Sequence, residues 1–213
     1  IEEAILAGVP LNMTLLFSRE HYLAAAGAFL RGIERRIAAG REPNIHSVAS
    51  LSVSRWDAAV IGRVPEPLRN KLGAAVAQRT YKAYCDLLSS PRWQRAYNAG
   101  ARPQRLLWVG TETVDPGTSN VFYIRALAVP FSIITLSERT FKALADCNDI
   151  GMLMPADGGD CEIVLGCFAQ AGIDVDALST ELQHEDAASA VKSWIELLSG
   201  IASKSAAIVQ AQW

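Results

Sequence analysis

The sequence predicts an α/β fold in which helices cover a parallel β-sheet. Four short, largely apolar segments are typical of buried strands, and each is followed by a segment with helical periodicity. Strands that are apolar on both faces indicate a parallel sheet, because helices cover both sides of such a sheet. No glycine-rich phosphate loop opens any of the helices, which argues against a Rossmann-type sheet. A closed β/α barrel needs eight strands. We therefore predict about half of a (β/α)8 TIM-type barrel.

The predicted elements alternate regularly along the chain. Residues 1–8 read as the end of a helix that Gly8 terminates, so Ile1 is expected to be a cut and not a natural start. Strands are predicted at 11–17, 48–54, 105–110 and 131–135. Helices are predicted at 18–40, from about 56, and at 68–88, 92–98, 121–127 and 138–147. The whole chain, 1–213, is expected to be a single domain segment: residues 1–150 supply the β/α units, and residues 156–213 add helices (160–172 and 178–203) that pack on the barrel.

Composition and charge exclude several classes of protein. Half of the residues are hydrophobic and 20% are charged, which is the balance of a globular chain and not of a disordered one. The net charge of −2 gives no electrostatic case for a nucleic acid or an anionic membrane as partner. No apolar run reaches the ~18 residues of a transmembrane helix, and no signal peptide is recognisable. Four cysteines without a C-x-x-C pair favour reduced thiols in the cytoplasm. The three histidines are far apart, so no metal site is expected.

Several motifs carry a resemblance to one family. The first strand, Asn12-Met13-Thr14-Leu15-Leu16-Phe17-Ser18, closely resembles the N-x-T-L-L-F-S strand of transaldolases. The second, 48–57, reads V-A-S-L-S-V-S-R-W-D and is similar to the serine-to-arginine phosphate-binding stretch of that family. Residues 101–108, A-R-P-Q-R-L-L-W, match bacterial transaldolases, and segments 172–178 and 191–194 fit the same group. The resemblance covers nearly the whole chain and implies strands five to eight of the barrel.

The resemblance also implies a reaction of sugar-phosphate metabolism, in the pentose phosphate pathway. Transaldolases are transferases that move a dihydroxyacetone unit from a ketose phosphate to an aldose phosphate through a lysine Schiff base, without a cofactor. That lysine belongs to a strand upstream of Ile1. The lysines of this chain all fall on helical patterns, and none is a credible replacement: Lys71, Lys82, Lys142, Lys192 and Lys204. The expected partners are a sugar phosphate and the remaining half of the barrel, from an upstream segment or another chain, and a homo-oligomer stays open.

Two polar residues of the first strand are the candidate catalytic positions. Asn12 and Thr14 alternate with apolar residues, so both are expected to project to the same side, into the barrel. The resemblance implies that Asn12 holds the carbinolamine or Schiff-base region and that Thr14 positions a water for proton transfer. A polar pair satisfied by neighbouring strands is the structural alternative.

Three further residues are candidates for binding substrate phosphate. Ser50 and Arg55 lie at the carboxyl end of the second strand, the end of a barrel that carries active sites. A guanidinium offers a planar fork to a phosphate, and the serine hydroxyl adds a neutral donor. The resemblance also places Thr111, after the third strand, in this region. The alternative for Arg55 is a surface ion pair with Asp57.

The chain departs from the family pattern at two strand ends. The bacterial G-T-K-[DN]-P motif is replaced by G-T-E-T-V-D-P at 110–116, so that Val114 stands where the lysine is expected and Glu112 adds a negative charge. Ile134 replaces the usual asparagine of the N-T-M-P-E motif. These changes should weaken phosphate binding, because charge-assisted hydrogen bonds are the strong ones. Two alternatives follow: an inactive transaldolase-derived binding or structural module, and a transferase for a different substrate, such as a ketose that lacks phosphate.

Overall fold

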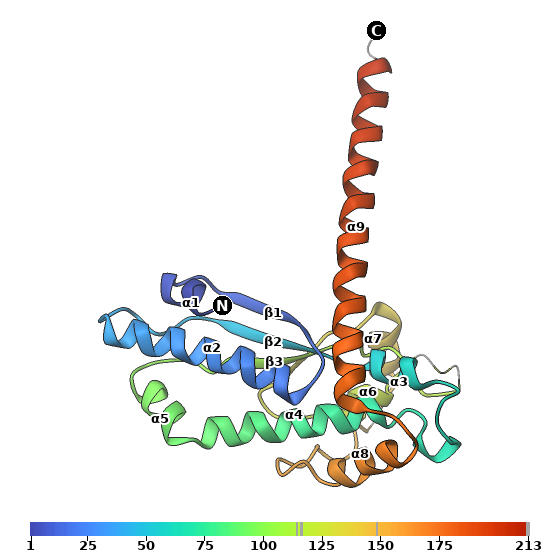
Figure 1. The fold of residues 1–213 in the computed structure, drawn as a ribbon, viewed down its shortest axis with the longest axis horizontal. Helices are drawn as coiled ribbons and strands as arrows, with labels where there is room; N and C mark the ends of the chain where they lie inside the picture. The colour runs from blue at the N-terminus through green and yellow to red at the C-terminus, as the bar shows by residue number, and fades with distance from the viewer. Residues whose placement is uncertain (114, 116, 148, 212–213) are drawn as a thin grey trace.

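The computed structural model describes residues 1–113, 115, 117–147 and 149–211, with side chains described as far as residue 205 in the last helix (Figure 1). Val114, where the family motif would have a lysine, lies outside the described residues. Within the described part of the chain, no helix combines the length and the apolar character needed to cross a bilayer.

The chain has an α/β fold with a four-stranded parallel sheet in the order β1-β2-β3-β4. This order is consistent with part of a TIM-type barrel, in which consecutive strands are neighbours. The strands are β1 (Leu11–Leu16), β2 (Ser47–Ser52), β3 (Arg105–Val109) and β4 (Ile133–Ile134).

All four predicted strands are found, and each is shorter than expected: β1 and β3 end one residue early, and β2 and β4 differ more. β2 stops at Ser52 because Ser54 already belongs to the helix that follows. β4 has only two residues: Phe131, at the predicted start of this strand, has a φ of 61°, which is outside the range of a strand.

The helices occupy the predicted positions, with shifted ends. Ser18 and Ser137 each accept a hydrogen bond from the backbone N–H three residues later, so both are N-caps as predicted. The helices are α1 (Glu2–Ala7), α2 (Arg19–Ala38), α3 (Ser54–Val60), α4 (Leu72–Ser89), α5 (Pro91–Asn98), α6 (Phe122–Ala126), α7 (Glu138–Ala145), α8 (Cys161–Gln170) and α9 (Val175–Ala211).

The start of α4 differs from the prediction that a helix begins at residue 68. A short 3-10 helix, η1 (Glu66–Leu68), comes first, and α4 begins at Leu72. The carboxylate of Asp57 accepts hydrogen bonds from the backbone N–H groups of Leu72 and Gly73 at 2.9 and 3.2 Å. A side chain fifteen residues upstream therefore acts as the cap that sets where the helix begins.

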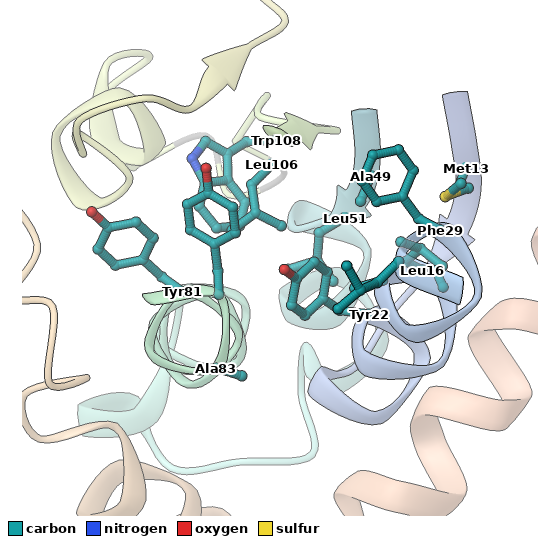
Figure 2. Packing of buried hydrophobic residues seen from close by; sticks show 14 of the residues in the cluster. Met13, Leu16, Tyr22, Phe29, Ala49, Leu51, Tyr81, Ala83, Leu106 and Trp108 are labelled. Carbon is teal, nitrogen blue, oxygen red and sulfur yellow. The ribbon is translucent and has the colours of Figure 1, made fainter. Parts of the chain in front are cut away.

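One face of the sheet packs against helices and forms the main core. Met13, Ala49, Leu51, Leu106 and Trp108 face α2 and α4, and all are at most 6% exposed. Figure 2 shows the side chains of Tyr22 and Phe29 from α2 and of Tyr81 from α4 packed on this side of the strands. This arrangement is the helix-covered outer face that a β/α unit presents.

The other face of the sheet is open. Asn12 and Thr14 of β1 are exposed, and Val48, Leu107 and Val109 on the neighbouring strands are partly exposed. In a parallel α/β sheet both faces are normally covered. Within the described residues, this face is instead only partly covered: Ser50 of β2 is buried, whereas Asn12 and Thr14 of β1 are exposed.

A second, smaller core joins α8 and the start of α9 to the rest. Phe17, Trp56, Leu72, Phe168 and Leu182 are among its buried side chains, and α8 packs along α4. Beyond residue 187, every described side chain of α9 is exposed, and the helix extends away from the body (Figure 1). That these helices pack on a completed barrel stays a prediction.

Candidate active site

The structure brings two of the candidate residues together. The hydroxyl of Ser50 donates a hydrogen bond to Oδ1 of Asn12 at 2.6 Å. Asn12 pairs with Val48 in the parallel register, so Ser50 lies two positions further along β2 and on the same face. Ser50 is only 2% exposed, whereas Asn12 is exposed on the open face. This bond sets the rotation of the amide, and its NH2 group is directed away from Ser50.

A β-bulge lies directly after Thr14. The register between β1 and β2 is regular to Met13 and resumes at Leu16, with one extra residue in β1. Met13 and Leu16 are both buried, although residues three apart in a regular strand point to opposite faces. The bulge thus returns β1 to the core after Thr14, which stays exposed with Asn12.

The bulge is stabilised by the last helix. Leu15 adopts a φ of 60°, which is strained for a residue with a side chain. Its carbonyl accepts a hydrogen bond of 2.7 Å from Nε2 of Gln183, on α9. The ring of His21 also lies here and accepts a hydrogen bond from the backbone N–H of Phe17 at 3.3 Å. Burial lowers the pKa of His21, which favours the neutral ring that this bond requires.

Arg55 lies in the first turn of α3 and faces the last helix. Its Nη2 is 3.1 Å from Oε2 of Glu185, and its Nε is 3.0 Å from Oδ1 of Asp186. The alternative pair with Asp57 is not formed among the described contacts. The buried Asp57 carboxylate instead caps α4 and accepts a hydrogen bond from the hydroxyl of Tyr123.

Thr111 lies just beyond the carboxyl end of β3 and is 3% exposed. Its hydroxyl donates a hydrogen bond of 2.6 Å to the backbone carbonyl of Thr135, which follows β4. The hydroxyl proton is therefore used in joining the ends of these two strands. Glu112 is exposed beside it.

The five candidate residues thus form one contact pair and three separate positions, of which Thr14 is exposed on the same face as Asn12. Asn12 and Ser50 are in contact, whereas the hydrogen bonds and ion pairs of the described residues link Arg55 to α9 and Thr111 to the β4 end. Sequence reasoning missed Gln183, Glu185 and Asp186. They lie on a segment that is typical of a solvent-exposed helix, and no local pattern marks a contact about 130 residues away.

No described lysine is suited to a Schiff base. All five lysines are exposed. The hydrogen bond that Lys82 donates to the Asp86 carboxylate raises the pKa of Lys82, whereas a nucleophilic amine needs a lowered pKa. Among the described residues, no three His, Cys, Asp or Glu side chains gather as a metal ion would require.

Comparison with known proteins bears on this arrangement. A family model described as Transaldolase/Fructose-6-phosphate aldolase matches residues 1–201. The chain belongs to this family.

The transaldolase of Parafrankia sp. (strain EAN1pec) is 36% identical, with 94% of this chain and 57% of the relative covered. The transaldolase of Thermobifida fusca (strain YX) is 37% identical, with 97% and 59% covered. That of Frankia alni (strain DSM 45986 / CECT 9034 / ACN14a) is 34% identical, with 95% and 57% covered. The chain therefore spans nearly three fifths of the length of these transaldolases, and it is a partial member of the family in that sense.

Proposed function

We propose that this chain forms strands five to eight of a transaldolase-type barrel and contributes substrate-positioning groups to an active site that the other half completes. The observation that carries this proposal is the Asn12–Ser50 pair on the open face of the sheet. Two polar residues in contact on the sheet face that the described residues leave partly exposed are what a barrel lumen needs. Membership of the family and the partial coverage of its relatives support the same reading.

In this proposal the reaction is the transfer of a dihydroxyacetone unit between sugar phosphates in cytoplasmic carbohydrate metabolism, without a cofactor. The Schiff-base lysine comes from the other half. The Asn12 amide, held by Ser50, donates toward the carbinolamine oxygen, and Thr14 positions the water that relays protons. Ser50, Arg55 and Thr111 contribute to the phosphate site, with Arg55 supplying the charge.

The other half of the barrel is proposed to pair with the two outer strands. β1 and β4 each have only one neighbour in the described sheet. Unpaired strand edges bind other strands, so an isolated half-barrel is prone to aggregate or to pair with itself. Strands from an upstream segment or from another chain would cover the edges and also close over the open face.

An inactive, transaldolase-derived binding module is the second candidate. The observation that favours it is the charge around the phosphate positions: Glu112 is exposed at the end of β3, and Arg55 is paired with two carboxylates. The partly exposed Ile134 takes the place of a polar residue. A transferase for a ketose without phosphate fits the same charges, and the experiment below separates the three.

The test is to trap the Schiff base. This chain is produced together with the part of the Thermobifida fusca transaldolase that it does not match, and the mixture is reduced with borohydride in the presence of fructose 6-phosphate or fructose. A covalent adduct on the added half, detected by mass spectrometry and absent when this chain is omitted, is expected.

The two sugars separate the candidates. An adduct with fructose 6-phosphate supports the transaldolase, and an adduct with fructose alone supports the altered substrate. If neither sugar gives an adduct although the two parts form a complex, the enzymatic proposals fail and the binding module remains. Asn12→Ala is expected to reduce the adduct strongly, with Lys204→Ala on the exposed end of α9 as the control.

A further inference from the structure

The pairing of Arg55 with the last helix has a consequence for the phosphate site. Two adjacent carboxylates, Glu185 and Asp186, approach the same guanidinium from α9. They reach different nitrogen atoms, Nη2 and Nε, at 3.1 and 3.0 Å. A phosphate bound bidentately uses the same fork, so the carboxylates and a phosphate compete for it.

A small cavity separates the two helices at this point. It has a volume of about 220 Å³ between α3 and α9, and its charged lining consists of Arg55, Arg63, Glu181 and Glu185. At roughly 30 Å³ per water molecule, this is space for several waters. The two arginines and two glutamates balance in charge, so the cavity as it stands does not attract an anion strongly.

The ion pairs of Arg55 with Glu185 and Asp186 are weak enough for another anion to displace them. Nε of Arg55 is buried and has no aligned hydrogen bond, although Oδ1 of Asp186 is near. The side chain of Arg55 is 42% exposed and that of Glu185 is 53% exposed. Ion pairs at such exposure contribute little to stability, because water screens them. A doubly charged phosphate can therefore replace them without unfolding the helix.

We propose that Glu185 and Asp186 are competing anions that occupy Arg55, so that a phosphate-bearing ligand binds there only when these carboxylates turn away. The inference rests on the proposed role of Arg55 in phosphate binding. It adds a device that lowers affinity for phosphate and sets the choice between phosphorylated and unphosphorylated ligands.

The carboxylates move as side chains, and the helix stays docked. Leu178 and Leu182 of α9 are at most 5% exposed, and Gln183 holds the carbonyl of Leu15. These contacts keep the first turns of α9 in place both when the carboxylates pair with Arg55 and when they have turned away. The exchange at Arg55 therefore requires rotamer changes only.

The experiment measures binding of inorganic phosphate to the full chain by isothermal titration calorimetry. The double variant Glu185→Gln/Asp186→Asn is expected to bind phosphate about tenfold more tightly than the wild type, because the competing charges are gone while Arg55 remains. The control Asp176→Asn/Glu196→Gln removes two negative charges from exposed positions of the same helix and should bind like the wild type. Circular dichroism verifies that each variant is folded; if the double variant is not, Glu185→Gln alone, at an exposed position, replaces it.

Adding Arg55→Ala to the double variant must abolish the gain. The inference is overturned if the double variant binds phosphate no more tightly than the control, or if the gain persists without Arg55. These outcomes are separate from the Schiff-base trap: an adduct with fructose 6-phosphate together with no gain in phosphate binding refutes the competing anions alone. If the double variant binds phosphate more tightly but no Schiff-base adduct forms, the competing carboxylates are supported and the chain is a binding module.

Discussion

Ser50 donates a hydrogen bond from β2 to the side-chain carbonyl of Asn12 on β1, with 2.6 Å between the two oxygen atoms. The bond joins a buried hydroxyl to an exposed amide, so the buried strand orients the group that faces the open side. Such support from a packed neighbour is what holds an active-site side chain in one rotamer.

Replacing Ser50 tests this support. Ser50→Ala should lower the free energy of unfolding by about 1 kcal/mol, the usual net contribution of one hydrogen bond. Ser52→Ala, two positions along the same strand, is the matched control, because no described hydrogen bond joins Ser52 to Asn12. Urea denaturation measures both variants, and equal losses would show that the bond to Asn12 contributes nothing specific.

Two glycines of α2 should respond in opposite directions to alanine. At Gly32, a new Cβ would lie 2.7 Å from Cβ of Ile5 and 2.9 Å from the carbonyl of Glu2, because α1 crosses there in close contact. At Gly27, the nearest atom is Nη1 of Arg31 at 3.5 Å. Gly32→Ala should therefore destabilise by about 1–3 kcal/mol through overpacking. Gly27→Ala should stabilise by about 0.5–1 kcal/mol through helix propensity. Thermal unfolding measures both, and a neutral Gly32→Ala would mean that α1 shifts freely.

Two leucines of α9 separate its docked and extended parts. Leu182 is 2% exposed and Leu198 is 47% exposed. Leu182→Ala should cost about 2–4 kcal/mol, since it leaves a cavity in the smaller core, whereas Leu198→Ala should change stability by less than about 0.5 kcal/mol. Chemical denaturation of the isolated chain measures both. A large loss at Leu198 would show that the far end of α9 packs against something, such as a second copy.

The buried carboxylate of Asp57 should make stability depend on pH. Burial raises the pKa of Asp57, and the hydrogen bonds from Tyr123, Leu72 and Gly73 offset part of that rise. Since the pKa is higher in the folded state, the folded chain binds this proton more tightly than the unfolded chain. The contribution of Asp57 to stability is fully present below its unfolded pKa, near 3.8, and is lost as pH rises through the folded pKa.

Asp57→Asn removes this titration and serves as the comparison. The difference in unfolding free energy between wild type and Asp57→Asn should shift in favour of the wild type as the pH falls from the folded pKa of Asp57 toward its unfolded pKa. Tyr123→Phe, which removes a hydrogen bond to the carboxylate, should raise the pKa of Asp57 further and cost about 2 kcal/mol at neutral pH. A wild-type minus Asp57→Asn difference that stays flat with pH would contradict the raised pKa.

Local patterns account for most of the secondary structure. The apolar segments around Met13, Leu51 and Leu106 predicted buried strands, because apolar runs of strand length bury both faces. Ser18 and Ser137 predicted helix starts, since their hydroxyls cap the helix within three residues. The predicted start of α4 was wrong because its cap, Asp57, is not adjacent to the helix in sequence.

In the candidate site, too, features set by local sequence were predictable and features set by distant residues were not. Alternation along β1 predicted that Asn12 and Thr14 share a face, which depends on strand geometry alone. The bulge at Leu15 and the contact of Arg55 with Glu185 are not predictable in this way, since both involve the distant helix α9.

The sequence by itself determined the order of strands and helices, the parallel sheet and membership of the transaldolase family, because these follow from patterns within a few turns of chain and from motifs. Only the tertiary structure decided which groups Asn12 and Arg55 contact and which face of the sheet stays open. Those contacts join segments far apart in the chain, 38 positions for Asn12 and Ser50 and 130 for Arg55 and Glu185, and the second depends on how α9 docks. Docking is set by the packing of all the elements together, which no local pattern encodes.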